Sequence, residues 1–278
     1  MAVVLGLLTA VFFGSGDFFG GLATKRTAVL NVVGISHLVG LIGVSALIPF
    51  FDSEFSASAL GFGVLAGGFS GAGVMLLYRG LARGPMAVIA PLTAITSAAV
   101  PTIWGVASGD SVSGVAWIGI AVALVAIGMV SIPNEMGAAP ITGQAIGEAL
   151  VSGACFGAMF IAFDAAPDTS APWPVVGARI FTVTLLLGFI ALKARDGLAT
   201  VRPALGAIVL AGLLDTGSNL LFLIATQQGG LTITAVLSSL YPAFTVLLAR
   251  FALDERMSRL QLGGLTAALI ATALIALG

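Results

Sequence analysis

The chain has 278 residues, of which 59% are hydrophobic and 8% are charged, whereas about a quarter of the residues in a typical soluble domain carry a charge. Eleven Lys and Arg and twelve Asp and Glu give a net charge of −1, which excludes a basic nucleic-acid-binding surface. The apolar composition excludes a disordered chain. So few charges cannot cover a surface exposed to water, and the remaining class is a polytopic membrane protein whose solvent is lipid.

Counts of cysteine and histidine exclude most metal and redox sites. Cys155 is the only cysteine and His37 is the only histidine, so the chain can form neither an internal disulfide nor a zinc-binding motif. The glycine-rich motifs that bind nucleotides are also absent from the sequence. We therefore expect no metal, no cofactor and no catalytic residue.

Ten apolar runs of roughly 20 residues, the length that crosses a bilayer as an α-helix, follow one another along the chain. They cover residues 2–23, 28–50, 59–78, 85–107, 113–132, 143–164, 172–192, 203–226, 230–250 and 259–277. The first run has no Lys or Arg before it, so we expect a retained helix and not a cleaved signal. The predicted fold is an all-α polytopic membrane protein with ten transmembrane helices.

The chain divides into two similar halves of five spans each. Residues 1–132 form the first predicted repeat, residues 133–142 a linker and residues 143–278 the second repeat. An offset of 145 aligns residues 84–128 with 229–273 without a gap. Because five is an odd number, the second repeat enters the membrane from the opposite face, as in secondary transporters that alternate between two open states.

Basic residues predict the orientation of the spans. Ten of the eleven Lys and Arg fall on one side of the ten-span arrangement, and this side should be cytoplasmic. The opposite loops carry acidic residues and no base: Asp52, Glu54, Asp110, Asp164 and Asp168. We expect a bacterial inner-membrane protein with both termini outside. The linker 133–142 has no basic residue and does not support this orientation.

Short motifs in corresponding places carry a family resemblance. Phe13-Gly14-Ser15 in the first span and the loop Asp254-Glu255-Arg256 are similar to motifs of the EamA-type members of the drug/metabolite transporter superfamily. Pro91 in the fourth span and Pro242 in the ninth are similar to a proline near the middle of the family's fourth span. The loop Gly109-Asp110-Ser111 departs from the family's loop motif because it lacks the basic residue. The chain resembles these ten-helix exporters over its whole length. The resemblance implies export of amino acids or similar metabolites, with YddG-type aromatic amino-acid exporters as suspected relatives.

Four of the ionisable side chains within the predicted spans are candidates for the site, because a charge in a span is costly and usually faces a cavity or a partner. They are Asp17, His37, Arg179 and Asp215. Asp215 shares a helix face with Ser218 and Asn219, which follow three and four residues later. This face could contact substrate or carry a coupling proton, or Asp215 could be a structural carboxyl held by hydrogen bonds between helices.

The other three ionisable side chains also have two interpretations each. Arg179 could bind the carboxylate of a substrate, or pair with Asp164 or Asp168 near the same end of its span, and we favour the pair. His37 could relay protons, but a neutral His37 that is hydrogen-bonded inside the bundle is favoured. A structural role is also favoured for Asp17.

The fourth and ninth spans combine proline bends with hydroxyl and aromatic side chains. Transporters use such bends at substrate sites, where hydroxyls can meet charged groups and aromatic rings can meet an apolar body or a cation. The alternatives are hydroxyls that join helices and aromatic rings at the membrane interface. The predicted substrate-binding residues are Tyr78, Thr93, Thr96, Ser97, Trp104, Asn219, Ser238, Ser239 and Tyr241.

Glycine recurs at every fourth position in the third span, at Gly63, Gly67 and Gly71, and predicts a close helix contact.

Taken together, the sequence predicts a secondary transporter that exports small metabolites by alternating access. The alternatives are a passive channel and a lipid-modifying enzyme, although no cluster of catalytic groups supports the enzyme. The expected partners are a small-molecule substrate and the lipid bilayer, without nucleic acid, and the choice between monomer and homodimer is open.

Overall fold

A computed structural model describes residues 1–53, 55–83, 86–130, 132, 143–193, 201–252 and 257–277. All of the regular elements in these residues are helical. They are α1 (Ala2–Thr24), α2 (Val29–Leu47), α3 (Ala57–Arg83), α4 (Met86–Ser108), α5 (Gly114–Val130), α6 (Gly143–Asp164), α7 (Trp173–Lys193), α8 (Leu205–Gly229), α9 (Leu231–Ser238), α10 (Tyr241–Ala252) and α11 (Arg259–Leu277), with the 3₁₀ turns Ile48–Phe50 and Arg202–Ala204. Each predicted span coincides with a helix, except that the ninth is divided between α9 and α10.

The helices suit a lipid environment. Within the described ranges, seven helical stretches are long and apolar enough to cross a membrane, and three shorter apolar stretches complete the set of ten. A helix satisfies its backbone hydrogen bonds internally, which a segment in hydrocarbon requires. Large apolar side chains such as Ile42, Leu262 and Leu269 are exposed on the outside of the bundle. The predicted all-α, polytopic fold class is confirmed.

The packing of the helices repeats between the two halves. In the predicted repeats, α1, α2 and α3 correspond to α6, α7 and α8. Helices α1 and α2 both pack on α8, and the corresponding helices α6 and α7 both pack on α3. Three further contacts join a helix to its own counterpart: α2 with α7, α4 with α9, and α5 with α11. This is the pattern expected of two five-helix repeats in opposite orientations. The linker 133–142 lies outside the described residues, so the repeat boundaries stay a prediction.

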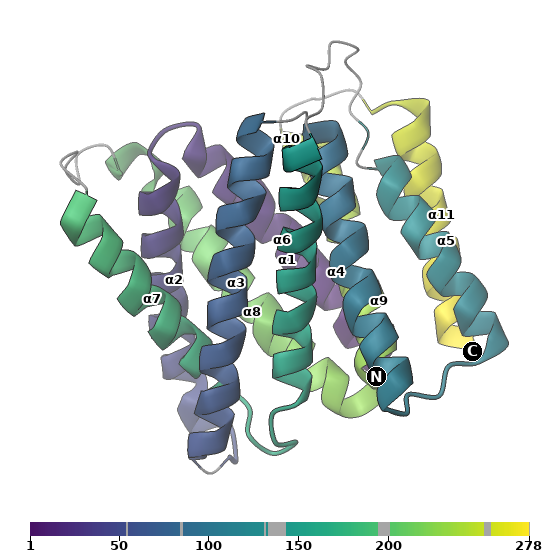
Figure 1. Ribbon diagram of the computed structural model, residues 1–278, viewed down its shortest axis with the longest axis horizontal. Coiled ribbons are helices and arrows are strands. Elements are labelled where there is room, and N and C mark those ends of the chain that lie inside the picture. Colours follow the sequence, from purple (N-terminus) through teal and green to yellow (C-terminus); the bar gives the residue numbers. More distant parts are fainter. Residues whose placement is uncertain are drawn as a thin grey trace.

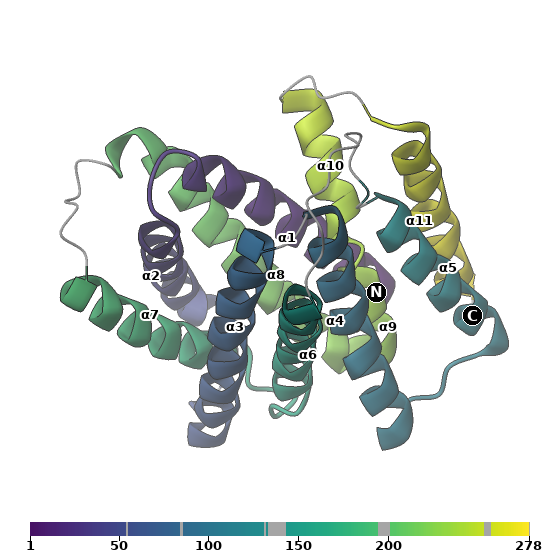
Figure 2. The same cartoon turned by 45° about the horizontal axis from the view of Figure 1, so that its top comes forward.

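The two halves interleave and do not stand side by side as separate bodies. Figure 1 shows both chain termini at the same end of the bundle, as an even number of crossings requires. In Figures 1 and 2, the pair α5 and α11 forms one flank, while α2 and α7 lie at the other. Helices α1, α4, α6 and α8 therefore come together near the middle, where residues of both repeats meet.

Glycines allow close approach where helices cross. A Cβ on Gly67 of α3 would lie 2.6 Å from the carbonyl oxygen of Ala178 in α7, and a Cβ on Gly63 would overlap Pro174. In the second repeat, a Cβ on Gly212 of α8 would overlap the carbonyl of Ser36 in α2. The predicted packing role thus holds for Gly63 and Gly67, and matching crossings join α3 to α7 and α8 to α2.

We predict that Gly67→Ala destabilises the protein by about 1–3 kcal/mol, the usual cost of overpacking, because the added methyl meets backbone of α7 and not a movable side chain. Thermal unfolding in detergent measures the effect. Gly61→Ala in the same helix is the control, since nothing lies within 4 Å of its Cβ. Equal melting temperatures for the two variants would contradict this account of the crossing.

The orientation is a second prediction, because it follows from the basic residues alone. A fluorescent reporter that matures only in the cytoplasm should be silent when fused after Gly278, because both termini are expected outside. The control is the same reporter fused to a chain that ends after Arg26, which should fluoresce. A bright fusion at Gly278 would reverse the orientation.

Candidate functional site

A cavity of about 130 Å³ lies at the centre of the bundle. Helices α1 to α4 of the first repeat and α6, α8 and α10 of the second contribute its walls: Phe13, Asp17, His37, Ser70, Val74, Leu77, Ser97, Phe156, Met159, Phe160, Asp215, Asn219 and Tyr241. Cavities of about 150 Å³ hold a benzene-sized molecule. The position between the repeats and the mixed polar and aromatic lining make this cavity the candidate solute site.

A larger crevice of about 350 Å³ opens between α2, α3 and α7. Apart from His37 its lining side chains are apolar, and two of them, Val29 and Met75, are exposed on the outer surface. The crevice begins where α3 and α7 diverge beyond the Gly67 crossing, at Gly71, whose Cβ would have no neighbour within 4 Å. It offers few groups that could orient a polar solute, so the central cavity is the better candidate.

Aromatic rings form one wall of the central cavity. The ring centroid of Phe13 lies 6.1 Å from that of Phe160 and 6.3 Å from that of Tyr241, and Phe160 stacks on Phe222 at 4.2 Å. Tyr241 was predicted, whereas Phe13, Phe156 and Phe160 were not. A signal for two of them existed, because an offset of 143 aligns Phe13 with Phe156.

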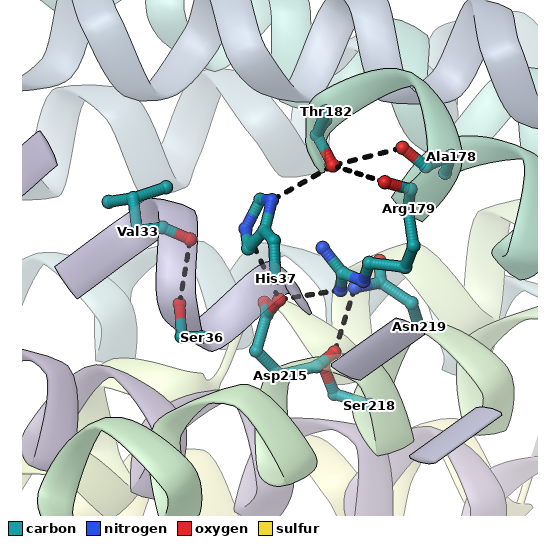
Figure 3. A network of polar contacts seen from close by, with 9 residues as sticks. All are labelled: Val33, Ser36, His37, Ala178, Arg179, Thr182, Asp215, Ser218 and Asn219. Carbon is teal, nitrogen blue, oxygen red and sulfur yellow. Dashed lines mark hydrogen bonds and ion pairs between the residues drawn. The ribbon is translucent and has the colours of Figure 1, made fainter. Parts of the chain in front are cut away.

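An ion pair joins α7 to α8 beside this cavity, with a buried Arg179 side chain and an Asp215 side chain that is 36% exposed. Nη2 of Arg179 lies 2.5 Å from Oδ2 of Asp215. Figure 3 shows the two side chains pointing toward each other. The predicted pairing of Arg179 with Asp164 or Asp168 is wrong. The reason is depth: Arg179 lies six residues after Trp173, the first residue of α7, or about 9 Å into the span at 1.5 Å per residue.

His37 approaches the ion pair from α2. Its Nδ1 lies 3.0 Å from the hydroxyl of Thr182, and that hydroxyl is also 3.0 Å from the carbonyl of Ala178. A helical threonine donates its single proton to the carbonyl four residues earlier, so its oxygen accepts a proton from Nδ1–H. Nε2 then faces Asp215 at 3.8 Å, beyond hydrogen-bond distance. The structure therefore holds His37 by Thr182; a proton-relay role stays a prediction.

The side chains that follow Asp215 bond to its backbone. Ser218 Oγ and Asn219 Nδ2 donate to the Asp215 carbonyl at 2.6 Å and 2.8 Å, so the three residues share a face as predicted. Asn219 Oδ1 and Arg179 Nε are buried without a hydrogen-bond partner among the described residues. Asn219 lines the central cavity, and its oxygen is an acceptor that no described residue uses.

Asp17 lies on the α1 side of the cavity. A Cβ on the adjacent Gly16 would be 3.3 Å from the backbone nitrogen of Asp215, so α1 crosses α8 at this point. The side chain of Asp17 is accessible within the bundle, and it forms no ion pair with any Lys or Arg of the described residues. The structure thus places Asp17 in the cavity wall and not in a structural pair.

The predicted hydroxyl and aromatic residues separate into two groups. Ser97 lines the cavity with Asn219 and Tyr241, and Ser70 joins them without having been predicted. Thr93 donates to the Ala149 carbonyl and so connects α4 to α6. Four others do not line this cavity. Thr96 donates to the carbonyl of Leu92 in its own helix, Trp104 is 54% exposed, and Ser238 and Ser239 are buried at the break between α9 and α10. The side chain of Tyr78 lies outside the described residues.

We predict that Asp215→Leu destabilises the protein by about 3 kcal/mol, because it leaves Arg179, whose side chain is 4% exposed, charged and unpaired. The double variant Arg179→Met/Asp215→Leu should recover most of this loss, since replacing both partners of a buried pair is often neutral. Chemical unfolding in detergent measures both variants. A double variant as unstable as Asp215→Leu would contradict the importance of the pair.

Comparisons with known proteins agree with this architecture. An uncharacterized protein of Methanocaldococcus jannaschii is 28% identical over 138 residues, which make up 48% of this chain and 98% of that protein. That relative is therefore about as long as one five-helix repeat. A crystal structure of another protein superposes with a TM-score of 0.77 at 16% identity, over 99% of this chain and 96% of that chain. This likeness shows the fold.

The family model of the EamA-like transporter family matches residues 145–277. These residues comprise nearly all of the second repeat, from α6 to α11. The resemblance to the drug/metabolite transporter superfamily that the short motifs indicated is confirmed there. The matched repeat contains Asp215, Asn219 and Tyr241, and this half of the chain is similar to the EamA-like transporter family.

Proposed function

We propose that this protein is a secondary transporter that exports small metabolites with an ammonium group, amino acids and aromatic amino acids among them, by alternating access. The match of residues 145–277 to the EamA-like transporter family supports a membrane transporter. The observation that carries the finer proposal is the central cavity, which lies between the two repeats and combines carboxylates, an amide and aromatic rings. An inverted pair of repeats can exchange conformations and expose such a site to each face in turn.

The lining supports an ammonium-bearing solute with an apolar body. The carboxylate of Asp17 and the unpartnered Oδ1 of Asn219 can accept hydrogen bonds from an ammonium group. The rings of Phe13 and Tyr241 offer flat apolar surface for the rest of the molecule. The sequence has no nucleotide-binding motif, so we infer that a solute or ion gradient drives transport, with Asp215 and His37 as candidates for coupling.

The broken ninth span supports movement at this site. Helix α9 ends at Ser238 and α10 begins at Tyr241. Pro242 has no N–H, so the carbonyl of Ser238 receives no helical hydrogen bond from it. Transporters place discontinuous helices of this kind beside their substrate sites. Because α10 contributes Tyr241 to the cavity, a change of angle at the break would move this wall.

Counterflow in proteoliposomes tests the transporter proposal. Unlabelled phenylalanine inside the vesicles should accelerate the uptake of labelled phenylalanine, and uptake should saturate, because a carrier returns faster when loaded. Vesicles without protein set the background. Flux that rises linearly with concentration and shows no counterflow would contradict alternating access and indicate a channel.

The role of the aromatic wall is tested by Phe13→Ala. We expect the apparent substrate constant to rise about tenfold, because losing roughly 1.5 kcal/mol of apolar contact corresponds to a factor of ten. Phe251→Ala is the matched control, since Phe251 in α10 is 80% exposed on the surface. Similar substrate constants for the two variants would exclude Phe13 from the site.

A further inference from the structure

The charges that line the central cavity are unbalanced. Its described lining includes two carboxylates, Asp17 and Asp215, and one histidine, but no lysine or arginine. Asp215 receives its counter-charge from Arg179 through the ion pair. Asp17 has no such partner among the described residues, although it lies at membrane depth, where an unpaired carboxylate is costly. A bound cation would supply the charge that Asp17 lacks.

The guanidinium of Arg179 is paired with Asp215 and does not line the central cavity. Its side chain is 4% exposed, and it is not among the residues that line the central cavity. Its Nε is buried without a hydrogen-bond partner among the described residues, and the side chain borders a second pocket of about 10 Å³. Three residues that line this small pocket, Ser70, Met159 and Asn219, also line the central cavity. Such a space is at the lower limit for one water molecule. The carboxylate of a substrate therefore finds no basic partner at this arginine.

The uncharged part of the lining favours cations as well. Asn219 is 5% exposed, and its Oδ1 is a buried acceptor without a partner in the described part of the chain. Phe13, Phe160 and Tyr241 present aromatic rings, whose faces attract a positive charge. Carboxylate, amide oxygen and ring faces all suit an ammonium group, and none of them suits a carboxylate.

We propose that this cavity selects organic amines that carry a single positive charge and an aromatic or apolar body, with Asp17 as their counter-ion. This inference rests on the proposed transport function and narrows its substrate class. An amino acid with the same body would bring its carboxylate beside Asp17 and Asp215 without a lysine or arginine in the described lining to receive it. The zwitterion therefore binds more weakly than the corresponding amine.

Three ligands that share a phenyl ring test this selection. Phenethylamine is a cation at neutral pH, because a primary alkyl amine titrates near the lysine value of about 10.4. Phenylalanine adds a carboxylate, and 3-phenylpropionate keeps only the carboxylate. Isothermal titration of the purified full chain in detergent should rank them in that order, with phenethylamine at least tenfold tighter than phenylalanine. Phenylalanine binding as tightly as phenethylamine, or tighter, would overturn the proposal.

Variants of Asp17 connect the selection to this residue. Asp17→Asn should weaken phenethylamine binding at least tenfold and abolish its advantage over phenylalanine, whereas Asp17→Glu should retain the advantage. Asp52→Asn is the control, since Asp52 is exposed outside the helices. An advantage that persists in Asp17→Asn overturns the assignment of Asp17. If Asp17→Asn does not fold, the test uses Asp17→Glu and the ligand ranking in the unmodified chain. Loss of the phenethylamine advantage in either would overturn the proposal.

The same measurements separate this inference from the function on which it depends. If neither phenethylamine nor phenylalanine binds and neither shows counterflow, the proposed function fails together with the inference. If phenylalanine shows counterflow and binds at least as tightly as phenethylamine, only the inference fails. Tight binding of 3-phenylpropionate would mean that a base reaches the cavity, and would also overturn the inference.

Discussion

The ion pair between Arg179 and Asp215 organises the polar centre of the bundle. An arginine cannot lose its proton inside a protein, so a buried guanidinium needs an anion, and α8 supplies it to α7. His37 and Thr182 pack around the same pair. Both Asp215 and Asp17 line the cavity, but Asp215 is paired with Arg179. Asp17 is therefore the cavity carboxylate without a basic partner among the described residues.

The spans could be predicted from the sequence because hydrophobic length is a local property of each segment. A proline bend in the ninth span was predicted from Pro242, but its division into two helices, α9 and α10, was not. Polar residues such as Asn219 stood out against their apolar helices, whereas Phe160 did not. The partner of Arg179 was missed because it depends on which helices pack together, and hydropathy carries no information about that.

The two repeats have kept their packing and diverged in their polar residues. An offset of 145 pairs Val64-Leu65-Ala66-Gly67 in α3 with Val209-Leu210-Ala211-Gly212 in α8. The same offset pairs Ser70 with Asp215, and both line the cavity. The first repeat thus contributes a hydroxyl where the second contributes the charge. The relative from Methanocaldococcus jannaschii is about as long as one repeat, so a chain of this length exists as a separate protein.

The ion pair also constrains how the protein enters the membrane during synthesis. Arg179 is made 36 residues before Asp215, which takes roughly 2–7 s at about 5–20 residues per second. During that interval α7 carries an unpaired arginine, which disfavours its insertion by about 2.5–3.5 kcal/mol if the charge is near the bilayer centre. We therefore expect α7 to remain at the translocon until α8 follows, so that the two helices enter the lipid together.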